Sequence, residues 1–596
     1  MKDFFKFTFA TICGIILLGI AACILFIITL VGIIASGSAS TKVEDNSVFV
    51  LKMNGMIEER TTENNPLYSL LGQANAEGMG LDDVVSSIRK AKDNDKIKGI
   101  YLEGGIMAFD APATAQQMRD ALEDFKKSGK WIVAYADQYM QMSYYVASVA
   151  DSMFLNKTGM IDFKGLGGKS EYMTGLFEKI GVRYQATRVG KYKSAVERVT
   201  RKNMSDDDRE QRTAYLTGVW KHMLKAMAES RGVTAAQLDQ LASDSIMAFA
   251  STDDYMKAHL VDRVMYPEEI KKVIKGMLEL DEDDDIAQLT LSDMLNVEDK
   301  KKDKGDEIAV YYAYGEIVDA PLSGLSTSHA IVSSEVVSDM QQLAKDDDVK
   351  AVVIRVNSPG GSAVASEQIW HAIELLKAKK PVVVSMGGLA ASGGYMMSAG
   401  ANYIFAEPTT LTGSIGIFGL IPNFSGLVTD KLGVTFDGVK TNRYGDYEEN
   451  LVMAKDNEEE LRHLQSYVDR GYETFLNIVA EGRSMTRDKV DEIAQGRVWL
   501  ATDALPIHLI DQIGTLDDAV KKAAELAKVE DEYHTTVYPG KSDWTEQLFA
   551  PEDKGTYLDS ELRSLLGEAY APVMEMRLNQ QRNRLQARLP FTLQMR

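Results

Sequence analysis

The strongest constraint on the fold of this chain is an internal duplication. Four segments of the first half recur in the second half at an offset of roughly 250 residues, a plausible domain length. They are 48–57 and 308–317, 91–100 and 344–352, 150–154 and 401–405, and 179–182 and 431–434. Both copies alternate β-branched runs with helical patterns, which is typical of α/β units with mostly parallel sheets. The chain should therefore fold as two tandem α/β domains of related structure.

Changes in composition divide the rest of the chain. A charge-dense stretch that is poor in apolar residues, 281–306, predicts a solvated connector with a short helix inside. We therefore expect a first domain at 46–280 and a second domain at 307–540. The final segment, 541–596, ends in arginines interleaved with leucines. It is predicted to be a helical tail that packs on a neighbouring subunit or, alternatively, contacts anionic lipid.

The N-terminus is predicted to anchor the chain in a membrane. Residues 7–41 contain no charged side chain and exceed the about 20 apolar residues that span a bilayer. Lys2 and Lys6 precede this run, which favours a cytoplasmic N-terminus and an exported body. A cleavable signal peptide is the alternative, since 36–40 offers small residues, but its apolar core is usually only about 7–15 residues long. We expect residues 1–45 to form a cytoplasmic stub and one retained transmembrane helix.

Composition excludes several classes of function. Both cysteines, Cys13 and Cys23, lie within the apolar run, so the body has no disulfide, no thiolate nucleophile and no cysteine metal site. A formal net charge of −21 disfavours nucleic acid as a partner. No Walker-type or dinucleotide motif occurs, and no cofactor is expected.

A serine in the second copy stands where a nucleophile would be presented. Ser392 follows an apolar strand-like run at 382–384, and Gly393 and Gly394 separate it from a helical pattern that begins at Tyr395. A serine at such a strand-to-helix turn exposes its hydroxyl beside free backbone N–H groups. The alternative is a serine that merely caps the helix.

A glycine pair upstream complements this serine. Residues 357–362 read Asn-Ser-Pro-Gly-Gly-Ser and follow another strand-like run. Consecutive glycines after a proline let backbone amides point into a site without interference from side chains. The N–H groups of Gly361 and Gly393 can then form a two-donor hole for a tetrahedral oxyanion.

Three ordered motifs carry a family resemblance. They are Asn-Ser-Pro-Gly-Gly at 357–361, Ala-Ser-Gly-Gly-Tyr at 391–395 and Leu-Thr-Gly-Ser-Ile-Gly at 411–416. Together they resemble the signal peptide peptidase A (protease IV) family, within the Clp-protease/crotonase superfamily, and the similarity extends over nearly the whole chain. The resemblance implies two Clp/crotonase-like domains and a serine endopeptidase that degrades cleaved signal peptides in the membrane. It also implies a homotetramer and, with the anchor, a bacterial inner-membrane location with the catalytic body outside the cytoplasm.

The base for Ser392 is the next question. None of the seven histidines lies in a motif with glycines or a hydroxyl, and lysine is the other known base for a serine. The resemblance assigns the base to Lys193, with Lys191 as a competitor, and assigns Ser414 to hold the lysine amine; an ordinary turn serine is the alternative. A lysine base must be neutral although free lysine titrates near 10.4, so we expect a closed, partly apolar site.

The duplication divides these residues between the copies. Opposite Ser392 the first copy has Gln141, and a slip in the alignment could place Ser143 there, still without flanking glycines. Opposite Lys193 the second copy has Gly445, and opposite the Pro-Gly-Gly loop the first copy has 105–108, which lacks the proline and the glycine pair. One complete Ser–Lys dyad therefore needs both halves, from one chain or from two subunits.

Two other function classes remain open at this point. A crotonase-like acyl-CoA enzyme shares the two-amide oxyanion hole but needs no serine nucleophile. A catalytically inactive membrane scaffold is the other alternative, although it would have no need for all three motifs. Pocket-lining residues are scattered over loops, so the sequence leaves the cleavage preference open; small and apolar side chains near the scissile bond follow from the resemblance alone.

Overall fold

The structure is a computed structural model. It describes residues 40–61, 79–244, 246–298, 305–320, 329–540 and 586–588, together with positions 6, 11, 14 and 17–19. Most of the expected anchor at 7–41 therefore lies outside the described residues. Among the residues described, no helix is both long and apolar enough to cross a bilayer.

The first domain is built on a sheet in the order β2-β1-β3-β4-β5-β7, with β8 beside β1 and every pair parallel. The strands are β1 (Ser47–Glu58), β2 (Met79–Gly80), β3 (Ile97–Phe109), β4 (Trp131–Tyr139), β5 (Ser152–Ile161), β7 (Arg263–Val264) and β8 (Gln288–Leu289). The helices are α3 (Leu81–Asp93), α4 (Pro112–Lys126), α5 (Gln141–Ala147), α6 (Thr174–Ile180), α7 (Glu197–Thr200), α8 (Asp206–Arg231), α9 (Ala235–Asp244), α10 (Thr252–Lys257), α11 (Pro267–Met277) and α12 (Leu291–Leu295). The last helix and β8 fall within the stretch expected to be a connector.

The second domain repeats this plan. Its sheet has the order β18-β16-β14-β12-β9-β20, with β15 between β14 and β19, and only the β16–β18 pair is antiparallel. The strands are β9 (Asp306–Tyr314), β12 (Val349–Ser358), β14 (Val382–Ala391), β15 (Tyr403–Ala406), β16 (Leu411–Gly413), β18 (Val498–Leu500), β19 (Gln512–Ile513) and β20 (Tyr533–Tyr538). The helices are α13 (Ser333–Leu343), α14 (Ala363–Lys377), α15 (Gly393–Ser398), α16 (Tyr447–Met453), α17 (Glu458–Gly482), α18 (Arg487–Ile493), α19 (Ala501–Ala504) and α20 (Leu516–Ala527).

The expectation of two related α/β domains with mostly parallel sheets is confirmed. The path β1-β3-β4-β5-β7 recurs as β9-β12-β14-β15-β19. A tyrosine at the equivalent position of each domain fixes the alignment of the two repeats. The hydroxyls of Tyr144 in α5 and Tyr395 in α15 each donate to a leucine carbonyl, at 2.9 and 2.8 Å. This register places Gln141 opposite Ser392. Ser143 is buried and binds the backbone of β3, so it belongs to the fold of the first domain.

A third sheet joins the two domains. Its order is β11-β10-β13-β21-β17-β6, from β6 (Arg183–Arg188), β10 (Glu316–Val318), β11 (Ala330–Val332), β13 (Gly360–Ser362), β17 (Phe418–Asn423) and β21 (Gln586–Arg588). The strand β6 comes from the first domain and pairs antiparallel with β17 over six residue pairs. This crossing brings the segment after β6, which contains Lys193, to the second domain.

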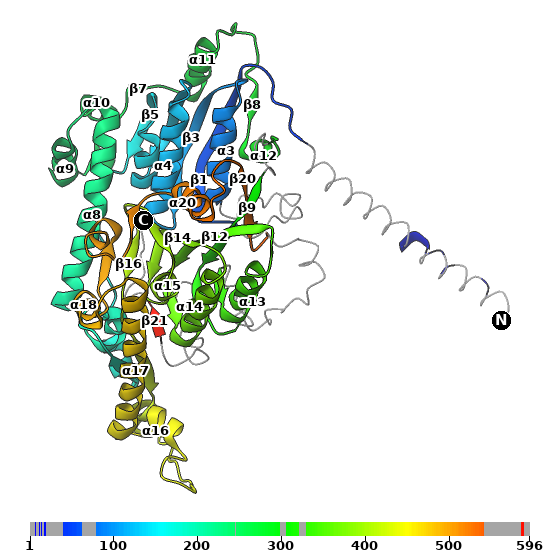
Figure 1. The fold of residues 1–596 in the computed structure, drawn as a ribbon. Coiled ribbons are helices and arrows are strands. Elements are labelled where there is room, and N and C mark those ends of the chain that lie inside the picture. Colours follow the sequence, from blue (N-terminus) through cyan, green and yellow to red (C-terminus); the bar gives the residue numbers. More distant parts are fainter. Residues whose placement is uncertain are drawn as a thin grey trace.

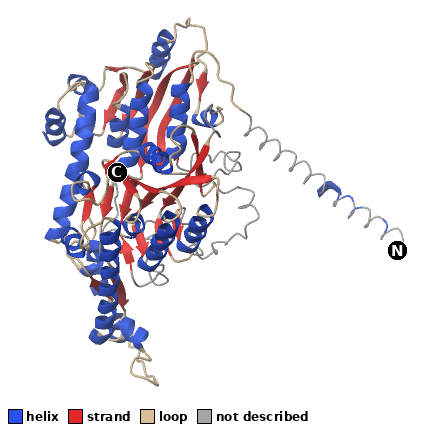
Figure 2. Cartoon of the chain, in the orientation of Figure 1, coloured by secondary structure: helices blue, strands red, loops and turns tan. Residues whose placement is uncertain are grey.

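The two domains pack against each other with helices on the outside. In Figure 1 the first domain, in blue and cyan, lies above the second domain, in green, and α8 runs along one side past both. Figure 2 shows the strands of both domains gathered between helices. Leu411 and Leu500 of the second domain belong to the apolar core of the first, so the two cores are in contact.

The predicted helical tail needs a correction. Of residues 541–596, the structure describes only 586–588, and these three form the strand β21. They are extended because their backbone pairs with β13 on one side and with β17 on the other. A helix was predicted for the segment as a whole, whereas at 586–588 the backbone completes two neighbouring strand edges.

Candidate active site

Ser392 sits on a sharp turn between β14 and α15. Its backbone has φ 57° and ψ −115°, a conformation that costs a non-glycine residue about 1–3 kcal/mol. The turn is held on both sides, since Ser392 N donates to Gly413 O at 2.8 Å and Met396 N donates to Ser392 O at 2.8 Å. The side chain is fully buried. This is the strained strand-to-helix geometry that aims a hydroxyl into a site.

Lys193 lies against this hydroxyl. Its Nζ is 2.7 Å from Ser392 Oγ, and 2.9 Å from both the hydroxyl and the backbone carbonyl of Ser414. A neutral amine has two N–H donors and one lone pair, so it can donate twice to Ser414 and accept the Ser392 proton. The three contacts can thus be filled by an uncharged lysine whose lone pair accepts from Ser392, as well as by an ammonium that donates to all three partners.

The electrostatic setting of Lys193 favours the uncharged form. The side chain is fully buried, and burial lowers the pKa of its amine well below the usual value of 10.5. Desolvation penalises the ammonium form, and none of the described carboxylates forms an ion pair with it to offset this penalty. The expected closed and partly apolar surroundings of the lysine are thus present.

Two glycines allow the chain to place Lys193 there. A β-carbon at Gly496 would lie 2.7 Å from the Lys193 Cβ, and one at Gly190 would lie 2.3 Å from the Gln495 carbonyl carbon. Both have positive φ, 75° and 99°, which other residues rarely adopt. Tyr192 N also donates to Gln495 O at 3.0 Å. No sequence motif marks Gly496, because its role depends on a contact between the two domains.

The competing lysine points elsewhere. The Lys191 side chain is 60% exposed and its Nζ lies 3.4 Å from Asp207. It also lies over the Tyr192 ring, at 4.7 Å from the centroid. Among the described residues, no histidine hydrogen-bonds to Ser392. Lys193 is therefore the basic side chain that reaches the serine.

The glycine pair lies beside the serine. Gly361 is in β13, between β10 and β21, and Gly393 is the first residue of α15. A β-carbon at Gly360 would lie 2.7 Å from the Gly393 nitrogen, so the β13 loop and the start of α15 are in contact. The first N–H groups of a helix lack acceptors within the helix, which leaves the Gly393 amide able to bind an oxyanion.

Residues of the first domain also support the oxyanion loop. Asn357 Nδ2 donates to Glu59 Oε2 and Asp110 Oδ2, both at 3.2 Å, and Asn357 Oδ1 accepts from Leu389 N at 3.0 Å. Burial is the largest cause that raises the pKa of Asp110, to about 6, and the negative charge of the nearby Glu59 carboxylate is the second. No motif marked these two acids, because their role depends on contact with the other domain.

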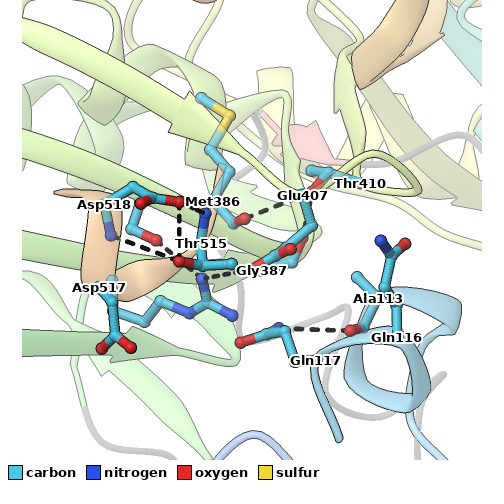
Figure 3. Close-up of polar contacts among 12 residues, drawn as sticks. Ala113, Gln116, Gln117, Met386, Gly387, Glu407, Thr410, Thr515, Asp517 and Asp518 are labelled. Carbon is cyan, nitrogen blue, oxygen red and sulfur yellow. Dashed lines mark hydrogen bonds and ion pairs between the residues drawn. The ribbon is translucent and has the colours of Figure 1, made fainter. Parts of the chain in front are cut away.

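A buried carboxyl lies close by in the same interface. Glu407 follows β15, and Figure 3 shows it with Gly387 and Thr410, across from α4 of the first domain with Gln116. It is fully buried, neither oxygen has a hydrogen-bond partner among the described residues, and Arg355 Nη1 is 3.9 Å away. Burial raises the pKa of the Glu407 carboxyl well above its usual value, which favours the protonated form.

Known proteins are similar to this chain in sequence. The model of the Clp protease family matches residues 323–410, and that of peptidase family S49 matches residues 124–281 and 374–530. The chain is 33% identical to Protease 4 of Haemophilus influenzae, over 84% of this chain and 83% of that protein. It is 34% identical to Protease 4 of Salmonella typhi, over 94% of this chain and 87% of that protein. It is 29% identical to the chloroplastic serine protease SPPA of Arabidopsis thaliana, over 82% of this chain and 70% of that protein.

Fold, site and relatives together define a serine protease with a Clp-like fold. The family model matches both halves of the duplication, and the alignments with the two Protease 4 relatives cover most of their length. The chain belongs to peptidase family S49.

Activity should depend on pH through Lys193. A base must be neutral, so kcat/KM should rise about tenfold per pH unit below the lysine pKa and become level above it. Because burial lowers this pKa well below 10.5, we expect the plateau to be reached well below that pH. Initial rates on a peptide whose own groups do not titrate would measure the profile. A midpoint at or above pH 10 would contradict a desolvated base.

Ser414→Ala should weaken turnover without abolishing it. The substitution removes one of the two acceptors that hold the Lys193 amine, while the Ser414 carbonyl at 2.9 Å remains. We expect a loss of about 10- to 1000-fold in kcat, in the range of a group that assists proton transfer. Binding of a peptide aldehyde should persist, because the nucleophile and the amides are intact. Wild-type turnover would show that this hydroxyl belongs only to the turn.

Proposed function

We propose that this protein is a membrane-anchored serine endopeptidase that uses a Ser392–Lys193 dyad to degrade cleaved signal peptides. The observation that carries the proposal is the 2.7 Å contact between a fully buried lysine amine and the hydroxyl of a strained serine. Both residues belong to one chain, so no second subunit is needed to complete the dyad.

The proposed reaction is acyl-enzyme hydrolysis. Lys193 Nζ takes the proton from Ser392 Oγ, which attacks the carbonyl carbon of the scissile bond. The backbone amides of Gly361 and Gly393 stabilise the oxyanion, and the ammonium of Lys193 then protonates the leaving amine. The same amine next takes a proton from a water whose oxygen attacks the ester carbonyl carbon, and when the bond to Ser392 Oγ breaks the lysine gives that proton to Ser392 Oγ.

Covalent labelling tests the nucleophile. A fluorophosphonate probe should label the wild-type protein on Ser392, as read by mass spectrometry of the digested protein. Lys193→Met should be labelled far more slowly, since the serine loses its base. An acyl-CoA enzyme or an inactive scaffold would show no labelling at Ser392. The absence of labelling at Ser392 would therefore end the endopeptidase proposal.

The proposed substrate class rests on the motif resemblance and on the long apolar run at 7–41. A synthetic signal peptide in detergent micelles should be hydrolysed faster than a soluble peptide of scrambled, charged sequence. Equal rates would contradict a preference for membrane-derived peptides.

We also propose a homotetramer in the bacterial inner membrane with its catalytic body outside the cytoplasm. Light scattering of the detergent-solubilised protein would measure the number of subunits. Added protease should digest the body in spheroplasts but not in inverted vesicles, and the opposite pattern would reverse the topology.

A further inference from the structure

One buried side chain of α8 contacts the segment that carries Lys193. Gln211 lies in this helix, which runs along one side of the molecule past both domains (Figure 1). Its Nε2 donates to the Tyr192 carbonyl and to Asp208 Oδ1, both at 3.0 Å. Asp208, also in α8, accepts from Ser194 Oγ at 2.6 Å. Because Tyr192 and Ser194 flank Lys193 in the chain, α8 holds this segment on both sides of the base.

The oxygen of the same side chain binds the strand that supports Ser414. Gln211 Oε1 accepts from the backbone N–H of Val498, in β18, at 3.1 Å. The strand β18 pairs antiparallel with β16, and Ser414 follows β16 directly. Ser414 N donates to the carbonyl of Arg497, the residue before β18, at 2.7 Å. One amide thus joins the segment of the base to the segment that holds its partner hydroxyl.

The partners of the Gln211 amide fix its orientation. A backbone carbonyl can only accept and a backbone N–H can only donate, so the amide cannot turn over without losing both bonds. A relative movement of the two segments would leave a buried backbone group unpaired, which is unfavourable. Lys193 Nζ and Ser414 Oγ are 221 residues apart in the chain and meet at 2.9 Å. The Gln211 bridge therefore restrains the spacing on which this contact depends.

We propose that Gln211 is a positioning residue of the reaction, which keeps the amine of Lys193 aimed at Ser392 by bridging the two backbone segments. This inference rests on the proposed function and adds a residue that acts through the base rather than on the substrate. Without the bridge the two segments can separate, and the amine spends less time within reach of the serine hydroxyl. Proton transfer depends steeply on this geometry, whereas binding of the peptide does not use the amine.

Gln211→Leu in the full chain, purified in detergent, tests the inference. It should lower kcat for a peptide by about 10- to 100-fold, because a small misplacement of reacting groups costs up to about 100-fold. Labelling of Ser392 by a fluorophosphonate should slow by the same factor. KM and the affinity for a peptide aldehyde should stay near the wild-type values, because the nucleophile and the oxyanion amides are unchanged. A merely structural role would lower the thermal unfolding midpoint but leave kcat at wild type well below that temperature, and this result would overturn the proposal.

Two further variants make the test specific. Gln116→Leu is the matched control: Gln116 is also a buried glutamine, but its Oε1 accepts from Thr409 Oγ1 at 3.3 Å, in the contact between α4 and the second domain. This variant should keep the wild-type kcat, and an equal loss in both leucine variants would contradict a specific role of Gln211. If Gln211→Leu fails to fold, Gln211→Asn replaces it, since it keeps the amide but is too short to reach both backbone partners. It too should lose kcat, and wild-type kcat in this variant would overturn the proposal.

The wild-type protein separates this inference from the proposed function. Hydrolysis by the wild type with an equal kcat in the folded Gln211 variants would disprove the positioning role alone. A wild-type protein that neither hydrolyses peptides nor becomes labelled at Ser392 would disprove the proposed function, and the positioning role with it.

Discussion

Ser392→Ala should reduce peptide hydrolysis by at least about 10⁴-fold. The substitution removes the atom that forms the acyl-enzyme, and variants of serine nucleophiles in other proteases lose activity on this scale or more. The fold should remain, because the hydroxyl contributes one hydrogen bond, worth about 0.5–1.5 kcal/mol. Turnover of a fluorogenic peptide and the thermal unfolding midpoint would measure the two effects separately.

Ser143→Ala is the matched control for this variant. Ser143 Oγ is buried and accepts from Met107 N and donates to Met107 O, both at 3.0 Å. Its removal leaves buried backbone groups unpaired and should cost about 1–3 kcal/mol of stability. Turnover at a temperature well below unfolding should stay near that of the wild type. Full activity in Ser392→Ala, or an equally inactive Ser143→Ala, would reverse the assignment of the nucleophile.

Lys193→Arg should be inactive although it preserves the charge of a free lysine. An arginine cannot give up its proton in a protein, so it cannot accept one from Ser392. The permanent charge would also be buried where none of the described carboxylates pairs with it, and we expect a loss of several kcal/mol in stability. Peptide turnover and a denaturant titration measure these two losses.

Two further variants separate the charge from the base. Lys193→Met fills the same apolar space without a charge, so it should stay folded and still lack activity. Lys191→Ala should keep activity, because that side chain is on the surface. Mixing Lys193→Met with Ser392→Ala should restore no activity, since both residues of the dyad lie in one chain. An active Lys193→Met would show that another group is the base.

Much of this site could be predicted from the sequence because its parts are local. The turn at Ser392 follows from a strand, one serine and two glycines in direct succession, and the structure has this turn with its positive φ. The Pro-Gly-Gly loop is equally local in sequence, although the short strand β13 that it forms was not predicted. Duplication and alternating strand and helix patterns likewise led to two parallel α/β domains.

The C-terminal segment shows where local patterns fail. A helical tail was predicted for this segment, yet the described residues 586–588 form a strand. A segment of three residues takes its conformation from the partners on either side of it. Here those partners, β13 and β17, are more than 150 residues away in the chain.

The sequence by itself determined that this protein has two related α/β domains and which residues could serve as nucleophile and oxyanion donors. Only the tertiary structure decided that Lys193 and Ser392, 199 residues apart, meet within one chain. It also decided that burial of the lysine lowers its pKa. The physical reason is that strand and turn patterns arise from neighbouring residues, whereas desolvation and the 2.7 Å contact arise when β6 crosses to β17 and the two domains close around the amine.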